Sequence, residues 1–513
     1  MPARRFPRAG VASPYYLAST AGLATLARGG NALDAAIAAN LALGVATPYL
    51  CGYGGDVFAI VWDGRLHGYL GSGRSPQGAT IDSVRDRAHT DTMPRFGPHS
   101  VTVPGAIAGW FDLLDRWGTR SFGELAELAL GYARDGFELT PMGELYVLGS
   151  LTMYEEYPAL QATYGDAKAG HALRQPGLAR TIEMLANDGP DAYYRGPIGA
   201  AIAEAVQAGG GLLTSDDLAA HQGRWADPLR ASYRNVEIVE LPPQTQGVSA
   251  LEALRILDGL PLPPDGPDRH HLLIETMKLA LEDRNDYVSD PDAMTVTPEA
   301  MLADDWIAER RARIDPDRAA TPEAGAAHVG GTAYLCAADG DGLLVSLIQS
   351  NFLSFGSGVH VPEWGINVNN RGASFTLDAT RVNALAPAKL PMHTLIPAMA
   401  MRDGAPWLVF GSMGGDSQAQ IQVQLLAHMI DDGEDPQDAL DAPRWCIDPS
   451  NWTMRAERTF PPEWFDALRA RGHEPKETAR GDAGMGHAHA IERTAGGYAV
   501  ATEPRTEGAA LGL

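Results

Sequence analysis

The sequence predicts a large layered protein that mixes α-helices with β-strands, and three observations lead to this expectation. Residues 17–47 are rich in Ala and Leu and read as two helices, broken at Gly29-Gly30 and restarted at Asn31. Residues 57–62 form an apolar strand that follows a glycine turn. From Thr332 onward, two apolar runs flank an Asp/Gly turn, which is typical of a β-hairpin. With 513 residues, 45% of them apolar, the chain can bury a large core.

The remaining elements follow in chain order. Residues 51–56, CGYGGD, match neither common phosphate-binding spacing and precede a strand rather than a helix, so we interpret them as a tight turn. Residues 104–310 alternate helical stretches with turns, and residues 213–218 carry the capping chemistry of a helix start. Residues 241–247 hold two prolines and are expected to form a fixed loop. Residues 409–416 read as a strand that ends in glycines before a helix at 418–429.

Composition excludes several classes of function. The formal charge is −24, from 64 acidic and 40 basic residues, which repels nucleic acid and anionic lipid. Three cysteines in a chain of this length argue against a disulfide scaffold or a structural zinc site. The basic N-terminus is followed by no apolar secretion signal, and no run approaches the roughly 20 apolar residues of a membrane span. We therefore expect a soluble cytoplasmic protein with no nucleic-acid partner and no membrane partner.

The segment that ends at Thr332 suggests a site where the backbone is cut and where Thr332 becomes a nucleophile. Residues 312–331 form a Pro/Ala/Gly segment without amphipathic period, which is either an ordinary domain linker or a segment that is cut. A threonine hydroxyl needs a base, and its own α-amine serves only if Thr332 begins a chain. Cleavage between Gly331 and Thr332 would create that amine and leave 312–331 as a mobile tail. The glycine pair before Thr332 suits a strained backbone during an N-to-O acyl shift.

A second element lies at Gly414 and Gly415, between a strand and a helix. Consecutive backbone amides at such a turn can hold a developing oxyanion. The alternative is a plain strand-to-helix turn, which the motif alone does not exclude.

Taken in order, these segments resemble the γ-glutamyltranspeptidase family of N-terminal-nucleophile hydrolases nearly from end to end. The matching segments are 29–36 (GGNALDAA), 54–55 before the strand, 103–105 with 109–110, 187–196 (NDGPDAYYRG), 209–214 with 217–218, 283–284, the hairpin from 332, 369–370, 411–415 (GSMGG), 442–444 and 503–505.

The resemblance implies a four-layer αββα fold of the α+β class, the N-terminal-nucleophile hydrolase fold. It implies autoprocessing into a large chain (1–331) and a small chain (332–513), which together form one unit. Thr332 falls on the family's nucleophile, and Gly414 and Gly415 fall on its oxyanion-hole glycines. Neither a metal nor an organic cofactor is implied, and a homodimer of processed heterodimers is left open.

Two departures from the family pattern concern the nucleophile and the carboxylate arginine. The family's Thr-Thr-His is Thr332-Ala333-Tyr334 here, so a second hydroxyl that helps position the nucleophile is missing, and slow processing is expected. The family's arginine for the glutamyl α-carboxylate corresponds to Arg74, two places later in the chain. Its long forked side chain is expected to reach a carboxylate, the alternative being a surface charge.

Further departures concern the rest of the substrate pocket. After Asn369 and Asn370, Arg371 replaces a glutamine, and Ser374 replaces the aspartate that binds the glutamyl ammonium. His393 and Thr394 replace the serine pair that binds the α-carboxylate, and both can still donate hydrogen bonds, although His393 is equally compatible with a structural role. We thus take Arg74, Asn370, Arg371, Ser374, His393 and Thr394 as candidate substrate contacts in a pocket that favours anions.

Three hypotheses remain. The first is an amidohydrolase or transferase that acts on a small carboxylate-bearing amide such as glutathione or another γ-glutamyl compound. The second keeps the mechanism but acts on a non-glutamyl amide, such as oxamate or a dicarboxylic acyl amide. The third is an unprocessed relative without catalysis.

Overall fold

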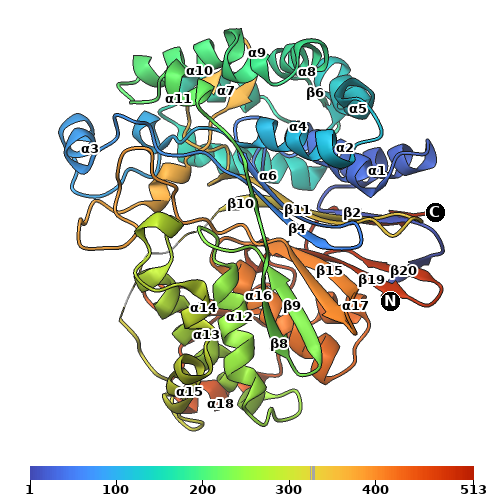
Figure 1. Ribbon diagram of the computed structural model, residues 1–513, viewed down its shortest axis with the longest axis vertical. Coiled ribbons are helices and arrows are strands. Elements are labelled where there is room, and N and C mark those ends of the chain that lie inside the picture. Colours follow the sequence, from blue (N-terminus) through green and yellow to red (C-terminus); the bar gives the residue numbers. More distant parts are fainter. Residues whose placement is uncertain (324, 326–327, 329) are drawn as a thin grey trace.

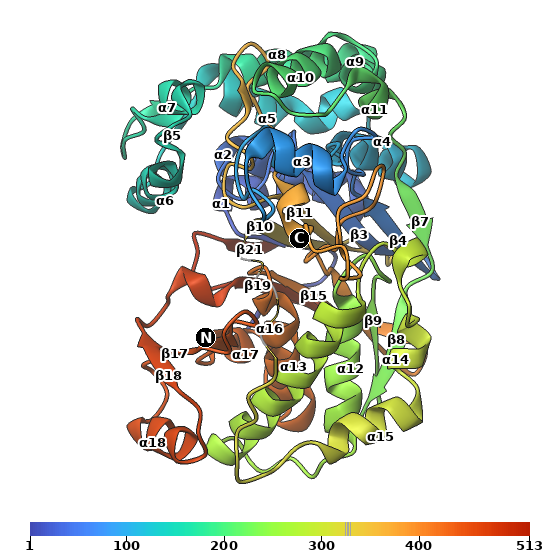
Figure 2. The ribbon, with the colours of Figure 1, turned by 90° about the vertical axis from the view of Figure 1, so that its left-hand side faces the viewer.

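The computed structural model describes the whole chain except residues 324, 326, 327 and 329. Two β-sheets lie face to face, and helices cover the outer face of each, as Figures 1 and 2 show from two directions. The expected four-layer αββα arrangement is therefore confirmed.

Each sheet has seven strands, and the strand order brings distant segments together. The first sheet runs β21 (Ala509–Gly512), β2 (Gly10–Ser13), β10 (Gly331–Ala338), β11 (Leu344–Phe352), β3 (Asp56–Trp62), β4 (Leu66–Gly71), β7 (Arg224–Ala226). The second runs β1 (Arg4–Phe6), β20 (Gly497–Ala501), β19 (His487–Thr494), β15 (Ala405–Met413), β14 (Ala398–Arg402), β9 (Val236–Glu240), β8 (Leu229–Tyr233). Each sheet combines strands from both sides of position 331, so the two expected chains share one fold.

The helices divide between the two outer layers. Over the first sheet lie α1 (Tyr16–Ala27), α2 (Ala32–Ala46), α3 (Ile81–Ala88), α4 (Ala106–Trp117), α5 (Phe122–Asp135), α6 (Pro141–Leu151), α7 (Pro158–Tyr164), α8 (Pro176–Asp188), α9 (Asp191–Tyr194), α10 (Pro197–Ala208) and α11 (Ser215–Ala219). Over the second lie α12 (Gly247–Asp258), α13 (Pro267–Tyr287), α14 (Pro298–Met301), α15 (Asp304–Ala312), α16 (Ser417–Leu426), α17 (Pro436–Asp441) and α18 (Pro462–Ala470).

Shorter strands form small sheets outside the two main ones. They are β5 (Phe137–Glu138) with β6 (Ala172–Leu173), β12 (His360–Val361) with β13 (Ile366–Asn367), and β16 (Trp445–Ile447), β17 (Met454–Glu457) and β18 (Pro475–Thr478). No described helix combines the length and the apolar character that a membrane crossing requires.

Alternation along the strands fixes which face each side chain occupies. In β3, Phe58 and Ile60 belong to the apolar layer between the sheets, whereas Val57 and Ala59 pack under the helices. In β10, Tyr334 belongs to the layer between the sheets as well. Residues two apart share a face of a strand, so Asp56, one step before Val57, faces the space between the sheets, and so does Thr332.

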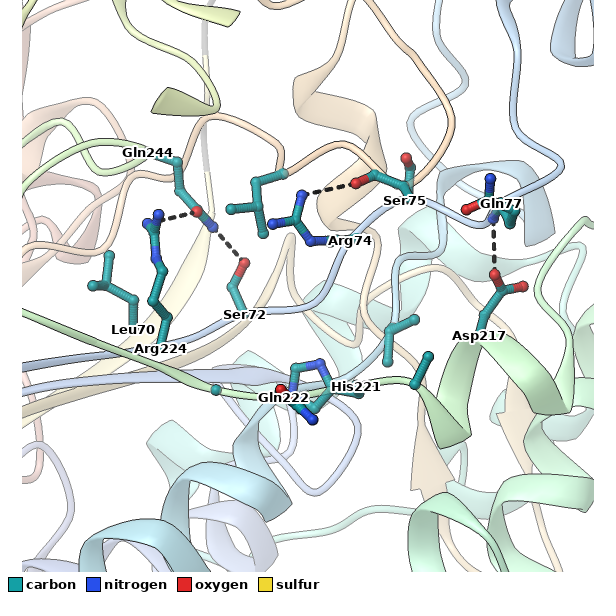
Figure 3. Close-up of a pocket in the computed structure, with 15 residues that line it drawn as sticks. Leu70, Ser72, Arg74, Ser75, Gln77, Asp217, His221, Gln222, Arg224 and Gln244 are labelled. Atoms are coloured by element: carbon teal, nitrogen blue, oxygen red, sulfur yellow. Dashed lines mark hydrogen bonds between the residues drawn. The ribbon is translucent and has the colours of Figure 1, made fainter. Parts of the chain in front are cut away.

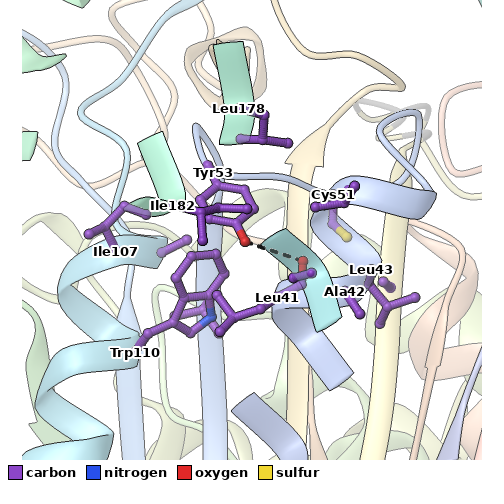
Figure 4. Packing of buried hydrophobic residues seen from close by; sticks show 14 of the residues in the cluster. Leu41, Ala42, Leu43, Cys51, Tyr53, Ile107, Trp110, Leu178 and Ile182 are labelled. Atoms are coloured by element: carbon purple, nitrogen blue, oxygen red, sulfur yellow. Dashed lines mark hydrogen bonds between the residues drawn. The ribbon is translucent and has the colours of Figure 1, made fainter. Parts of the chain in front are cut away.

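The helix-side core fixes the turn before β3. Tyr53 packs edge-on against Trp110, with ring centroids 5.0 Å apart (Figure 4). The Trp110 indole donates to Asn40 over 2.6 Å. This packing holds the CGYGGD turn against α2 and α4. The interpretation of that segment as a tight turn is confirmed, and it delivers Asp56 to the start of β3.

The other sequence-based elements also agree with the structure. Asn31 caps α2 through a capping box with Asp34, and Thr214 with Asp217 does the same for α11. The hairpin at 332 is β10 and β11, although β10 begins one residue earlier, at Gly331. Residues 241–246 form the expected loop, although Gly247, which was expected to belong to it, begins α12.

Candidate active site

Thr332 lies at the beginning of β10, where the register with β11 is irregular. Gly331 pairs with Phe352 and Ala333 with Gln349, so two steps on one strand match three on the other. Thr332 is 1% exposed, and its hydroxyl donates to Ser350 Oγ over 3.3 Å. Ser350 Oγ in turn donates to the carbonyl oxygen of Gly331 over 2.6 Å and accepts from Phe352 N over 2.7 Å. One hydroxyl therefore joins the Thr332 side chain to the carbonyl that precedes it.

Sequence reasoning missed Ser350. A hydroxyl was expected at position 333, where alanine stands, and Ser350 supplies one from the partner strand instead. The available signal was the hairpin itself, because a register count across the turn places Ser350 near Thr332.

The glycine turn after β15 packs against the segment that precedes Thr332. Gly414 and Gly415 have φ of 141° and 58°, which disfavour other residues. A Cβ on Gly415 would lie 2.0 Å from the carbonyl oxygen of His328. Gly330, Gly414 and His328 also line one cleft of about 210 Å³. The structure thus brings the predicted oxyanion turn beside the residues just before Thr332.

Asp416 forms hydrogen bonds with the segment that precedes Thr332. Its backbone N–H donates to the His328 carbonyl over 2.9 Å, and its carboxylate accepts from His328 N and pairs with Arg284. Burial acts to raise the pKa of the Asp416 carboxyl, but Arg284 and His328 outweigh burial and hold it below its usual value. The Asp416 carboxylate is therefore ionised at neutral pH.

A second buried polar group lies further along the sheet. Ser350 pairs with Asp56 across β11 and β3. Asp56 Oδ1 accepts from Gly105 N over 3.2 Å, and Oδ2 lies 3.1 Å from His393 Nε2. Arg371 Nε lies 3.9 Å from the same Oδ2.

Arg371 is held by further contacts. Its guanidinium donates to Thr394 Oγ1 over 3.3 Å and stacks 4.0 Å from the centroid of the Phe352 ring. Three predicted substrate residues, Arg371, His393 and Thr394, therefore meet in one cluster. Asp56, which was not among the predicted residues, completes it.

Burial dominates the electrostatics of this cluster. It raises the pKa of Asp56 to about 7, against the lowering effect of Arg371. It lowers the pKa of Arg371 to about 9, against the raising effect of Asp56. Burial and then the Arg371 charge lower the pKa of His393 well below its usual value, so this imidazole is neutral at pH 7.

Arg74, another predicted substrate residue, lies apart from this cluster. Arg74 is about half exposed, donates to the Ala388 carbonyl over 2.8 Å and pairs with Asp290 at 3.3 Å. It lines a separate cavity of about 360 Å³ with Ser72, Arg224 and Gln244 (Figure 3). Within the described residues, the lining of that cavity includes neither Thr332 nor the glycine turn.

Asn370 and Ser374 flank Arg371 and support its loop. The Asn370 side chain accepts from Leu353 N over 2.9 Å and donates to the Arg95 carbonyl over 2.7 Å, so its amide is already occupied. Ser374 Oγ donates to the Arg371 carbonyl over 2.9 Å and lines a cavity of about 390 Å³ together with His328.

Among the residues that the structure describes, two clusters have the composition of metal ligands, but neither includes a residue of the Thr332 site. They are His271, Glu275 and His473, and His428, Asp432 and Glu434. In the first, the Glu275 carboxylate already accepts from Lys278 Nζ and Ala320 N, each over 2.8 Å. The Glu275 carboxylate is therefore already paired with a lysine cation.

Comparison with known proteins matches the chain to one family. The family model described as gamma-glutamyltranspeptidase matches residues 18–513. The chain belongs to the γ-glutamyltranspeptidase family. As a member of this family it is an N-terminal-nucleophile hydrolase or acyltransferase.

Relatives within the γ-glutamyltranspeptidase family differ in their named activities. The chain is 36% identical to an oxamate amidohydrolase proenzyme of Klebsiella pneumoniae, over 98% of this chain and 97% of the relative. It is 33% identical to a glutathione hydrolase-like proenzyme, YwrD, of Bacillus subtilis, over 98% of both. Its structure superposes on a cephalosporin acylase from Bacillus halodurans with a TM-score of 0.95 and 38% identity, covering 100% of this chain and 98% of the other.

Proposed function

We propose that the protein is a proenzyme that cuts its own backbone before Thr332 and then hydrolyses a small carboxylate-bearing amide through a threonyl ester. The observation that carries this proposal is the contact of Ser350 with both the Thr332 hydroxyl and the Gly331 carbonyl. Two relatives named as proenzymes support the processing step.

Processing begins when the Thr332 hydroxyl attacks the Gly331 carbonyl carbon. Ser350 stabilises the charge that develops on the carbonyl oxygen, because its hydroxyl already donates to it. The C–N bond breaks, the Thr332 nitrogen takes the proton, and Gly331 becomes esterified to the Thr332 oxygen. Water hydrolyses that ester and leaves chains 1–331 and 332–513.

Turnover repeats the same chemistry on a substrate. The freed Thr332 amine takes the hydroxyl proton, and the oxygen attacks the amide carbonyl of the substrate. The amides of Gly414 and Gly415 stabilise the oxyanion, the C–N bond breaks, and the amine leaves with the proton. Water then releases the acid and restores Thr332.

The acyl group is bound by the cluster around Arg371. Its guanidinium, with Thr394 beside it, provides charged and neutral donors for a carboxylate. The contacts of Arg74 and Asn370 place neither in this cluster, so we assign substrate binding to Arg371, His393 and Thr394. Oxamate, γ-glutamyl amides and dicarboxylic acyl amides all carry such a carboxylate.

Gel electrophoresis and intact mass test the proposal directly. Purified wild-type protein is expected to resolve into chains 1–331 and 332–513, whereas Thr332→Ala is expected to stay whole. Wild-type protein that stays a single chain and turns over no amide would favour the non-catalytic hypothesis.

A further inference from the structure

Asp56 lies on the same row of the sheet as the nucleophile. Thr332, Ser350 and Asp56 occupy three neighbouring strands, β10, β11 and β3, and Ser350 contacts Thr332 and pairs with Asp56. Neighbouring strands lie about 4.8 Å apart, so Asp56 is roughly 10 Å from Thr332 across the sheet. That separation suits the far end of a small acyl group attached to Thr332.

Arg371, whose guanidinium lies near Asp56, has N–H groups without a hydrogen-bond partner among the described residues. Its Nε and Nη2 are buried and make no hydrogen bond within the described part of the chain. Nη1 donates to Thr394, and Nε lies 3.9 Å from Asp56 Oδ2, beyond hydrogen-bond distance. A buried guanidinium with two open N–H groups is costly unless an acceptor completes it, and the fork of Arg matches a carboxylate. The stack on Phe352, which pairs with Gly331, keeps the fork near the junction.

Asp56, unlike Arg371, has a partner for each polar atom of its side chain. One oxygen accepts from Gly105 N and the other faces His393 Nε2, and neither oxygen is among the unpartnered buried atoms of the described residues. Two donors of Arg371 thus have no hydrogen-bond partner among the described residues, whereas each oxygen of Asp56 already has one. Ser374, where an aspartate was expected in the γ-glutamyl pattern, adds no acceptor charge, and its hydroxyl is bound to the Arg371 carbonyl.

We propose that Asp56 and Arg371 form an acyl seat that takes a carboxylate and rejects an ammonium beside it. Arg371 binds the carboxylate with Nε and Nη2. Asp56 is a positioning residue that lies against the guanidinium and contacts His393. An α-ammonium would lie beside the Arg371 cation, and Ser374 supplies no carboxylate to pair with it. A buried charge without a counter-charge is strongly unfavourable. This inference rests on the proposed function, because it names the acyl class for Thr332.

Two anilides that differ only in the α-ammonium test this seat. Glutaryl anilide and γ-glutamyl anilide have the same chain, the same carboxylate and the same leaving group. For the processed wild-type enzyme, we expect kcat/KM to be at least about tenfold higher for glutaryl anilide, because a charge-assisted contact commonly changes binding by about 10- to 100-fold. A preference for γ-glutamyl anilide would overturn the proposal.

A substitution of Arg371 tests whether this residue binds the carboxylate of the substrate. Arg371→Lys keeps a charge but loses the fork, and is expected to raise KM for glutaryl anilide by about tenfold with little change in kcat. The matched control is Arg402→Lys, an arginine that stacks on Trp407 at the far end of β14 and is exposed. Equal effects of both substitutions would count against a carboxylate seat at Arg371.

Asp56→Asn separates the two roles that a carboxylate can have here. A positioning role predicts that the low rate on γ-glutamyl anilide does not fall further. If Asp56 is instead an ammonium seat, the substitution abolishes turnover of γ-glutamyl anilide selectively, which would refute the proposal.

Inhibition of wild-type enzyme gives a readout that needs no variant to fold. Glutarate is expected to compete with substrate, and L-glutamate to compete at least about tenfold more weakly. Stronger competition by L-glutamate would contradict the seat. Processing is followed on gels in parallel, so wild-type protein that never cleaves counts against the proposed function, whereas cleaved enzyme with the opposite preference counts against the seat alone.

Discussion

The hydroxyl of Ser350 donates to the carbonyl oxygen of Gly331 over 2.6 Å and accepts from the hydroxyl of Thr332 over 3.3 Å. The nucleophile and the bond it would attack are therefore joined through one side chain. This relationship exists in the uncut chain, so it bears on processing before it bears on turnover.

Replacing Ser350 with alanine is expected to slow self-cleavage roughly 100-fold, since loss of one oxyanion donor commonly costs that much. Ser350→Thr, which keeps a hydroxyl, is expected to retain most of the rate. A time course on denaturing gels measures both. The control is Ser346→Ala on the same strand, whose buried hydroxyl contacts Tyr334 and the Phe410 carbonyl instead. Slowing of the same size in this control would mean that any buried hydroxyl of β11 matters.

Much of the fold follows from local sequence signals. The capping box at Asn31 and Asp34, the Asp/Gly hairpin after Thr332 and the glycine turn at 414–415 each depend on residues that are close in the chain. Such signals act within a few residues, and here they place the elements correctly.

The cluster around Asp56 and Arg371 is less accessible to sequence reasoning. Ser350 and Asp56 meet only because β11 pairs with β3, a long-range register that no local pattern encodes. Arg74 was assigned by its position in a motif, yet its loop carries it toward Ala388 and Asp290. Arg371 became a candidate because it departs from the family pattern, but its contacts with Asp56 and Thr394 are visible only in the structure.

Gly415→Ala is expected to destabilise the protein and to impair processing. The residue has φ of 58°, and a Cβ would lie 2.0 Å from the His328 carbonyl oxygen. Strain at such a position costs about 1–3 kcal/mol, before the clash is counted. Gly404→Ala is the matched control, because Gly404 has φ of 75° and its Cβ would meet nothing within 4 Å. Thermal unfolding in the Thr332→Ala background compares the two, and equal losses would leave the contact with His328 without effect.

Binding of glutarate is expected to weaken between about pH 7 and pH 9. Below pH 7 Asp56 is neutral, because burial raises its pKa to about 7, and Arg371 is free to bind the anion. Above pH 7 the ionised Asp56 competes for Arg371, so the inhibition constant rises by up to about tenfold per pH unit.

Several other groups face Asp56. The titratable groups are Arg371 and His393, with Tyr193 and Tyr194 nearby, and burial raises the pKa of both tyrosines. Neither tyrosine titrates near neutrality, so the increase in the inhibition constant between about pH 7 and pH 8 is assigned to Asp56, and Asp56→Asn is expected to remove it. Loss of the Arg371 charge near its pKa of about 9 adds a second increase at higher pH, which Asp56→Asn retains. An unchanged pH profile in that variant would contradict the assignment.

Asp416→Asn is expected to slow processing and to lower stability, because Asp416 holds both Arg284 and the backbone of His328 beside the junction. Removing one partner of a buried ion pair costs about 3–5 kcal/mol, since the other charge stays buried. The same contact also fixes the segment before Thr332, so the rate of cleavage should fall even when the protein is folded. Glu237→Gln breaks the exposed Arg230–Glu237 pair and is expected to cost less than about 1 kcal/mol. Chemical unfolding of both variants in the Thr332→Ala background gives the stabilities, and a gel time course gives the rates. Normal cleavage by folded Asp416→Asn protein would show that the tie to His328 serves folding alone.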